Sequence, residues 1–447
     1  MSLHLDALRI LLASGPQSAQ QLIEKMGISQ PTLSRALSRL GDEVVRLGAA
    51  RSMQYTLRDT SRGAADIPVY RVNVEGQIRV LGTLVAVRPQ GFVMRQADGV
   101  TLHSDGLPWW LFDMRPQGFL GRAYAARHAA ALGLPTRLSD WSDDHVLRAL
   151  LVHGHDVVGN LLLGDLARDR FLSTPLPAPV ADAQKAEFYR QLALNAANGE
   201  VAGSSAGGEQ PKFAVYASTP AGPRHLLVKF SEVEDSPVSE RWRDLLLAEH
   251  LALETLRAAG ISAAQTYVFD HGGQRFLEVE RFDRVGSLGR RALHSLTALD
   301  AEFVGSGTGS WPLVARRLAD AGQIEPQAIE GAAMLWAFGT LIGNTDMHSG
   351  NMSFIAEQKR PYALAPTYDM TTMAFAPRSG GGLPVGIAAP NIQAEVPNDI
   401  WRRAEFLARE LLVRLHASNG FSPRFGACIT ALENHLNAAS AAIARLG

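Results

Sequence analysis

Two carboxylates and an amide stand at the spacing that phosphoryl transfer requires. Asp346 and Asn351 lie five residues apart, directly after the apolar run 332–342, and Asp369 follows 18 residues after Asn351. Phosphoryl transfer needs a carboxylate that orients or deprotonates the acceptor hydroxyl, together with oxygen ligands for Mg²⁺. The pattern therefore predicts Asp346 as the catalytic base and Asn351 and Asp369 as metal ligands.

A lysine and a glutamate earlier in the chain fit the same chemistry. Lys229 lies in the apolar run 225–230, and Glu249 follows 20 residues later in a run of helical periodicity, 245–256. A carboxylate on a helix orients a phosphate-binding lysine through a charge-assisted hydrogen bond. Each acid alone is more typical of a helix cap or a surface charge, but the order of all five residues favours a kinase.

The segment 203–211 is rich in glycine and serine and leads into Lys212. Glycine lets backbone amides approach phosphate oxygens. The spacing matches neither the Walker A motif nor Gly-x-Gly-x-x-Gly, so this loop is weak evidence by itself. His348 leaves two interpretations open, a phosphate contact or a hydrogen bond that orients the loop. Asp369-Met370-Thr371 departs from the Asp-Phe-Gly of many kinases.

These residues must be positioned by elements that the local pattern predicts. Glycine and proline interrupt the periodic runs and mark the turns between them. The polar segment after residue 280 is placed to present backbone groups to a nucleobase. The expected elements are a helix over 182–198, a hairpin of strands 212–216 and 225–230, a helix over 245–256, a strand from 276, a helix over 332–342 and a strand over 362–365.

The first 58 residues show a helix, a second helix that Ser18 can cap, a turn at Gly27 and a third helix to residue 40. Two strand-like runs, 44–47 and 53–57, follow, so the unit resembles a winged helix-turn-helix. Seven basic and four acidic residues give it a positive charge. The start of its third helix would enter the DNA major groove. The residues expected to contact DNA are Ser29, Gln30, Thr32, Ser34 and Arg35. A dimerisation or protein-docking role is the alternative.

The middle of the chain predicts a small β-rich part. A linker over 61–68 precedes strand-like runs at 69–74, 78–87 and 91–94. The aromatic segment 108–118 suits either a platform that stacks bases or a hydrophobic joint between subdomains, and the joint is the favoured interpretation.

Composition narrows the class of protein. The chain of 447 residues is 46% hydrophobic and 19% charged, with a net charge of −1, which is typical of a globular protein with several domains. The single cysteine, Cys428, excludes an internal disulfide and a cysteine-rich zinc site. Neither a signal-peptide pattern nor an uninterrupted apolar span is present, so we expect a cytoplasmic protein without a membrane segment.

Taken together, these motifs resemble the HipA family of bacterial serine/threonine kinases, the toxins of HipBA toxin–antitoxin systems. The resemblance extends over about four fifths of the chain. The matching segments are 204–212, 227–229, 279–284, 342–351 and 366–369.

The resemblance implies a two-lobed kinase-like fold of class α+β that binds ATP and Mg²⁺. The implied domains are a winged helix-turn-helix over 1–62, a β-rich part with the kinase N-lobe over 68–285 and a helical C-lobe over 286–447. It also implies that the segment 280–282 holds adenine. The implied ATP-binding residues are Ala206, Gly207, Gly208, Lys212, Lys229, Glu249, Glu280, Arg281, Phe282, His348, Asn351, Tyr368 and Asp369.

Regulation and partners are also implied by the resemblance. HipA kinases autophosphorylate a serine of the glycine-rich loop, which here is Ser204 or Ser205. They usually meet a separate helix-turn-helix antitoxin, whereas this chain carries its own DNA-binding-like unit, as in the HipA-like toxins called HipH or YjjJ. Some relatives phosphorylate aminoacyl-tRNA synthetases, so a translation protein is one candidate substrate.

Two other functions remain open on the residues. The loop from Asp346 to Asn351 also resembles the Asp-Leu-His-Pro-Gly-Asn loop of small-molecule phosphotransferases, although Asn344 stands where they carry a histidine. A transcription regulator that only senses nucleotide is the second alternative. The intact set of Lys229, Asp346, Asn351 and Asp369 speaks against lost catalysis.

Overall fold

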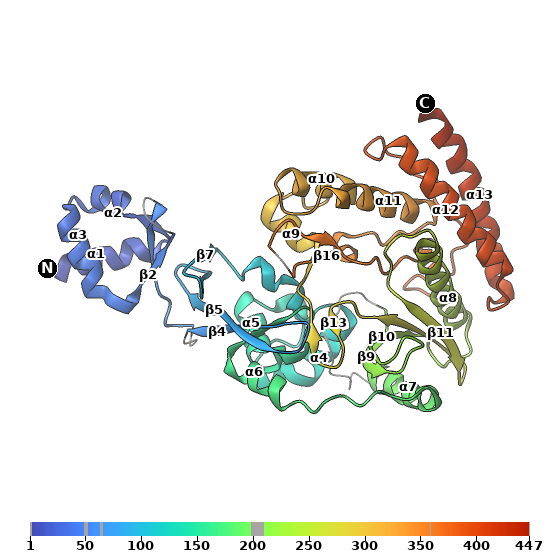
Figure 1. The fold of residues 1–447 in the computed structure, drawn as a ribbon, viewed down its shortest axis with the longest axis horizontal. Helices are drawn as coiled ribbons and strands as arrows, with labels where there is room; N and C mark the ends of the chain where they lie inside the picture. The colour runs from blue at the N-terminus through green and yellow to red at the C-terminus, as the bar shows by residue number, and fades with distance from the viewer. Residues whose placement is uncertain (1, 49–51, 63–65, 198–209, 358, 447) are drawn as a thin grey trace.

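The computed structural model describes residues 2–48, 52–62, 66–197, 210–357 and 359–446, and it shows a mixed α/β chain in which an N-terminal unit projects from a larger body (Figure 1). The Gly-rich loop, 203–209, lies outside the described residues. Within the described ranges, no helix is both long and apolar enough to cross a bilayer.

The N-terminal unit has three helices and a three-stranded sheet. Ser18 caps the second helix in a capping box with Gln21, and Gly27 ends that helix at φ 63°. Leu8, Leu22 and Leu37 meet in its core. The elements are α1 (Ser2–Ala13), β1 (Gln17–Ser18), α2 (Ala19–Met26), α3 (Gln30–Leu40), β2 (Val44–Leu47) and β3 (Gln54–Leu57), with the antiparallel strand order β1-β3-β2.

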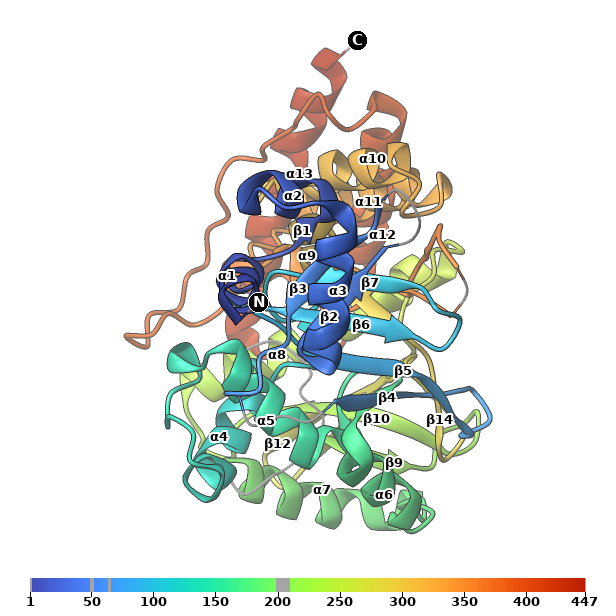
Figure 2. The same ribbon diagram turned by 90° about the vertical axis from the view of Figure 1, so that its left-hand side faces the viewer.

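A small apolar cluster, which we call the apolar seam, joins this unit to the next sheet. Val45 and Leu47 of β2 are buried against Val85, Val87 and Val93 of the neighbouring sheet. The backbone pairing continues across the junction, because Arg58 forms an isolated antiparallel bridge with Val87. The unit is therefore packed onto the body through β2 and the residues that follow β3. Figure 2 views the molecule from the side of this unit, which lies in front of the rest of the chain.

The second part is an antiparallel five-stranded sheet with the order β7-β6-β5-β4-β8. Its strands are β4 (Ile67–Val72), β5 (Ile78–Ala86), β6 (Phe92–Gln96), β7 (Thr101–Ser104) and β8 (Leu161–Leu163). The helical elements around it are η3 (Trp109–Met114), α4 (Gly118–Leu132), α5 (Asp143–His153) and α6 (Gly164–Ser173).

The expected linker over 61–68 extends too far, because β4 already begins at Ile67. Pro68 lacks a backbone donor and is tolerated in this strand, since β8 pairs only with Val69–Arg71 and leaves the Pro68 edge free on that side. Pro68 therefore belongs to the start of β4 and not to a linker.

The third part is the four-stranded antiparallel sheet β11-β12-β10-β9. The strands are β9 (Lys212–Ala217), β10 (Arg224–Phe230), β11 (Thr266–His271) and β12 (Gln274–Glu280), and two helices flank them, α7 (Asp182–Ala197) and α8 (Pro237–Ala258). Phe276 and Val228 pack toward Tyr189 of α7, whereas Leu277 packs toward Leu246 of α8. The expected hairpin of β9 and β10 and the helix that carries Glu249 are confirmed.

The C-terminal part is a helical body with one large core that includes Trp311, Phe338 and Trp401. Its helices are α9 (Leu296–Phe303), α10 (Trp311–Asp320), α11 (Gln327–Leu341), α12 (Asn398–Ala417) and α13 (Gly426–Ile443). A small sheet of β15 (Leu293–Ser295), β16 (Ser353–Ile355) and β17 (Ala363–Leu364) lies between these helices and the sheets. The two-stranded ribbon of β13 (Arg284–Val285) and β14 (Gly289–Arg290) follows β12.

The buried contacts of Asp283, between β12 and β13, predict that its replacement lowers the stability of the fold. Its buried carboxylate accepts from Arg281 at 2.7 and 2.9 Å and from Arg284 at 2.6 Å. Asp283→Ala leaves two buried guanidinium groups without this counterion, so the free energy of unfolding should fall by about 3–5 kcal/mol. Urea denaturation followed by circular dichroism measures the change.

Asp270→Ala is the matched control. Asp270 also accepts two bonds from one arginine, Arg275, but its side chain is 58% exposed, against 7% for Asp283. It should lose about 1 kcal/mol or less. The arginines hold the pKa of Asp283 well below its usual range, so its contribution is present at neutral pH and fades as the pH falls below about 4. Equal losses in both variants would contradict this assignment.

Candidate active site

A buried ion pair links the four-stranded sheet to its covering helix. Alternation along β10 turns Lys229 toward α8, and its Nζ donates to Glu249 Oε1 and Oε2 at 2.7 and 2.8 Å. Lys229 is 4% exposed and Glu249 1% exposed. The predicted partnership of the two residues is confirmed in the geometry.

Asp369 approaches the same lysine from the C-terminal part. Its carboxylate also accepts from Lys229 Nζ. Within the described ranges Asp369 is the single non-glycine residue with a positive φ, 55°. Left-handed backbone costs an ordinary residue about 1–2 kcal/mol, so the surroundings must hold it. Asn344 Nδ2 donates to the Asp369 carbonyl at 3.2 Å and supplies part of that support.

The three charged groups of Lys229, Glu249 and Asp369, which we call the charge triad, change one another's pKa values. Burial would lower the pKa of Lys229, but Asp369 and Glu249 together raise it above its ordinary value. Burial raises the pKa of Asp369, yet Lys229 and then Lys212 bring it below the ordinary value. For Glu249 burial prevails and the pKa is raised. The lysine therefore stays cationic, with Asp369 as its ionised partner.

The loop after α11 is braced so that Asp346 is presented to the surface. The Asp346 backbone N–H donates to Asn344 Oδ1 at 3.0 Å, and Asn351 Nδ2 donates to the Asp346 carbonyl at 2.8 Å. Asn351 is buried, whereas Asp346 is exposed. His348 Nδ1 accepts from the Gly350 N–H at 3.0 Å, so the loop-orienting bond that the sequence left open is present.

One cavity of about 510 Å³ gathers the candidate residues from both sides. The predicted residues that line it are Lys212, Lys229, Glu280, Arg281, Phe282, Asp346, His348, Asn351, Tyr368 and Asp369. Glu249 lies behind Lys229 and holds it. Ser204, Ser205, Ala206, Gly207 and Gly208 fall outside the described residues.

The segment after β12 borders the cavity with mixed roles. The Arg281 guanidinium forms an ion pair with Asp283, and both residues line the cavity. The Phe282 ring lies 5.7 Å from the ring of Tyr368, centroid to centroid. Tyr368 donates to the Gly350 carbonyl at 2.9 Å and thereby ties this wall to the loop that carries Asp346 and Asn351.

The second part of the fold contributes a wall that the sequence did not predict. Phe112, Asp113 and Gln117 line the cavity. Asp113 is half-buried, desolvation raises its pKa, and its carboxylate accepts from the Ser295 N–H at 2.7 Å before α9. The ring centroid of Trp109 lies 4.7 Å from that of His294 and 5.2 Å from that of Phe303. These contacts support the favoured interpretation of the segment 108–118 as a hydrophobic joint. The sequence feature that could have indicated this wall is Asp113, an aspartate within the aromatic segment.

The DNA-contact candidates lie on α3. Ser29, Gln30 and Arg35 are exposed, and Thr32 is half-buried with its hydroxyl 3.0 Å from that of Ser29. Leu33 and Leu37 face the core, so the polar side chains form the outer face of the helix. Glu43 is paired with Arg9 at 2.8 and 2.9 Å, and this ion pair leaves the net positive charge of the unit unchanged.

In the described part of the chain, no three His, Cys, Asp or Glu residues are grouped to hold a metal. The oxygen donors of Asn351 and Asp369, which line one cavity, instead suit Mg²⁺, which is commonly held by one or two protein oxygens together with substrate phosphates.

Comparison with known proteins identifies the family to which the chain belongs. Residues 204–427 match the HipA-like C-terminal domain, and residues 63–172 match the middle domain of YjjJ-like toxins. The chain therefore belongs to the HipA-like family. Within that family it is 40% identical over 439 residues to Toxin YjjJ of Escherichia coli (strain K12), a match that covers 98% of each chain.

One solved structure supports the fold, and a second is similar over a smaller share of the chain. A chain of the Shewanella oneidensis MR-1 complex of HipA, HipB and operator DNA superimposes with a TM-score of 0.50 at 16% identity, covering 85% of this chain and 97% of that one. The Helicobacter pylori proinflammatory kinase CtkA gives a TM-score of 0.39 at 15% identity, covering 53% of this chain and 93% of that one.

The charge triad predicts a pH-dependent defect in Lys229→Met. Removing the cation leaves the carboxyl groups of the buried Glu249 and the half-buried Asp369 without this partner, so their pKa values in the folded state should rise above the unfolded values. Such groups stabilise below the unfolded pKa, about 4.3 for glutamate, and the benefit is lost as the pH rises. We expect a loss of about 3–5 kcal/mol at neutral pH and a smaller loss near pH 5.

Thermal unfolding at about pH 5 and pH 7.5 checks this expectation, with Lys25→Met, an exposed lysine of α2, as the control. The control should show no pH-dependent difference from the unaltered protein. A Lys229→Met defect that did not grow with pH would contradict the triad.

Proposed function

We propose that the protein is an ATP- and Mg²⁺-dependent serine/threonine protein kinase fused to a DNA-binding unit. The observation that carries the proposal is the buried Lys229, held by Glu249 and Asp369, in a cavity whose opposite wall presents Asp346 and Asn351. This is the set of groups that phosphoryl transfer uses.

The cavity fits the cofactors in volume and in chemistry. Its volume of about 510 Å³ is within the usual range for small-molecule sites. Lys229 offers a cation to phosphates, and the oxygens of Asn351 and Asp369 are ligands that Mg²⁺ prefers. Asn351 and Asp369 would hold Mg²⁺, which would supply positive charge against the phosphates of ATP.

The protein's own residues have separate tasks in this proposal. Asp346 would orient the acceptor hydroxyl and take its proton, because it is exposed at the cavity while its backbone is braced from both sides. Glu249 would hold Lys229 in place whether or not Asp369 also served as a metal ligand. The backbone of Glu280 to Phe282 would face the adenine ring.

The proposal extends to regulation and growth. The relative from Escherichia coli is named a toxin, and we propose that this chain phosphorylates a cytoplasmic protein, with aminoacyl-tRNA synthetases and other translation proteins as candidates, and thereby arrests growth. It would also phosphorylate itself on Ser204 or Ser205. Phosphate carries about −1.5 to −2 charge, so on this loop it would repel the phosphates of ATP and lower activity.

Radiolabelled ATP, given to the purified protein with and without cell lysate, separates the possible activities. Label on lysate proteins supports the proposed kinase, and label on the protein itself, mapped by mass spectrometry, supports autophosphorylation. Label only in small molecules indicates a small-molecule phosphotransferase. ATP binding without transfer indicates a nucleotide-sensing regulator.

Asp346→Ala and Asp369→Ala should fail in different ways. The first removes the group that acts on the hydroxyl, so transfer should fall by at least about 100-fold while nucleotide binding changes little. The second removes a metal ligand, so Mg-ATP should bind at least about tenfold more weakly. Transfer assays and calorimetry measure the two effects.

Asp320→Ala, at the exposed end of α10, serves as the control and should match the unaltered protein in both assays. Full turnover in both site variants would disprove the assignment.

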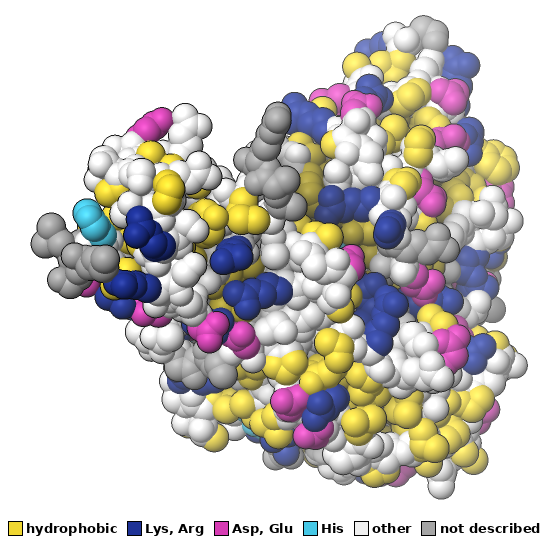
Figure 3. All heavy atoms as spheres, turned by 60° about the vertical axis from the view of Figure 1, so that its left-hand side comes forward, with side chains coloured by type: hydrophobic (Ala, Val, Ile, Leu, Met, Phe, Trp, Pro, Cys, Tyr) yellow, Lys and Arg dark blue, Asp and Glu magenta, His cyan; other side chains and the backbone are white. Residues whose placement is uncertain are grey.

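The first unit would act as a winged helix-turn-helix that binds double-stranded DNA through α3. Figure 3 shows Lys and Arg side chains on this unit and on the adjoining surface. The exposed polar face of α3, without an acidic residue, suits the major groove. Because the apolar seam ties the unit to the body, the full chain is the form to test.

We expect salt-sensitive binding of the full chain to its operator, since phosphate contacts release counterions. The double variant Gln30→Ala/Arg35→Ala should weaken binding by about 1–3 kcal/mol per lost contact, as measured by gel shift with genomic fragments. Arg190→Ala on α7, also exposed, is the control. If no fragment shifts in a salt-dependent way, a docking role replaces DNA binding.

A further inference from the structure

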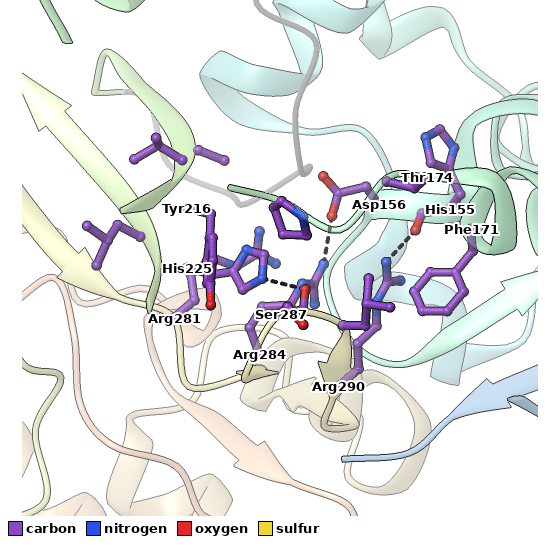
Figure 4. Close-up of a pocket in the computed structure, with 15 residues that line it drawn as sticks. His155, Asp156, Phe171, Thr174, Tyr216, His225, Arg281, Arg284, Ser287 and Arg290 are labelled. Atoms are coloured by element: carbon purple, nitrogen blue, oxygen red, sulfur yellow. Dashed lines mark hydrogen bonds and ion pairs between the residues drawn. The ribbon is translucent and has the colours of Figure 1, made fainter. Parts of the chain in front are cut away.

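A second cavity, of about 270 Å³, lies beside the first (Figure 4). Alternation on the paired strands β9 and β10 puts Tyr216 and His225 on the same face as Lys212 and Lys229, but nearer to the turn of the hairpin. The other walls come from the ribbon of β13 and β14 and from residues around α6. Arg281 lines both cavities.

Buried positive charge exceeds buried negative charge at this cavity. Arg281 and Arg284 are paired with Asp283, and Arg284 also reaches Asp156 at 3.1 Å. Arg290 is 5% exposed and has no ion pair among the residues that the structure describes. Burial, and then the charge of Arg284, lower the pKa of Arg290 to about 9. Three guanidinium groups thus share two carboxylates, so one cation lacks a counterion.

Two residues that line the cavity, Arg290 and His155, each have a buried nitrogen without a hydrogen-bond partner in the described chain, Arg290 Nη1 and His155 Nδ1. The rest of Arg290 is fixed, because it donates to the His155 carbonyl and its guanidinium lies 4.7 Å from the centre of the Phe171 ring. Buried polar groups in folded proteins are nearly always satisfied. A bound group that accepts hydrogen bonds would satisfy Arg290 Nη1, and His155 Nδ1 as well where that nitrogen carries the proton.

We propose that this cavity binds the phosphate group of a small molecule, as free phosphate or as a compact phosphate monoester, on Arg290 and His155. A phosphate group supplies the missing negative charge and the acceptor oxygens that the planar arginine fork matches. Water would satisfy the hydrogen bonds but would leave the charge uncompensated. Phe171 and Tyr216 offer ring surface to an organic part, and the small volume excludes a whole nucleotide.

A ligand bound in the second cavity would affect the first cavity. The Arg281 N–H donates to the His225 carbonyl at 2.9 Å, and Arg281 directly precedes Phe282 of the first cavity. A ligand beside His225 therefore contacts the segment proposed to hold adenine. The binding site itself does not depend on the proposed kinase activity.

Thr174 allows a test that leaves the buried arginines intact. This exposed residue lines the cavity after the end of α6, and its hydroxyl donates to the Arg170 carbonyl. Thr174→Glu adds a negative charge at the mouth, and Thr174→Gln adds nearly the same volume without charge. Calorimetry with the full chain would use inorganic phosphate, glycerol phosphate and AMP as probes.

We expect binding of phosphate or glycerol phosphate that weakens at least about tenfold in Thr174→Glu and changes less than about twofold in Thr174→Gln. Arg290→Gln should also lose binding. Thr174 and Arg290 line the second cavity and not the first, so these losses separate the two sites. Tighter glycerol phosphate identifies a monoester as the ligand, whereas equal affinities identify free phosphate. Absent binding, equal effects of the two Thr174 variants, or tighter AMP would overturn the proposal.

Discussion

The contact of Lys229 with Glu249 and Asp369 is the constraint on which the rest of the site depends. The three residues come from β10, α8 and the segment after β17, so a single ammonium group joins the sheet, its helix and the C-terminal body. A buried cation is tolerated only where its partners are held in good geometry. The lobes must therefore meet in one arrangement for the charge to be satisfied.

Much of the surrounding structure serves to keep that arrangement. Asn344 holds the loop before Asp346 and also the strained backbone of Asp369, so one side chain couples the two carboxylates that the proposed chemistry separates by task. Thr371 extends the same support, because its hydroxyl donates to the Leu245 carbonyl of α8 at 3.2 Å. A shift of either loop would be felt at the lysine.

The sequence predicted best what depends on near neighbours or on a distinctive order of residues. Ser18 and Gly27 mark helix ends through local bonds and backbone angles, and the order of Lys229 and Glu249 matched a known chemical pairing. The wall that carries Asp113 was missed, because only the packing of the aromatic joint brings residue 113 next to residue 295. The sequence also did not show that Arg290 lacks an ion-pair partner, because the residues around its buried guanidinium are far apart in the chain.

The apolar seam constrains how the two parts of the chain that it joins can evolve. Val45 and Leu47 belong to the N-terminal unit, and Val85, Val87 and Val93 belong to the second part, yet the five side chains form one buried cluster. Exchanging either part between relatives would expose the complementary half to water and create an adhesive patch. The two parts are therefore expected to recombine and to diverge together, as one cassette, although the motif of the first ends near residue 58.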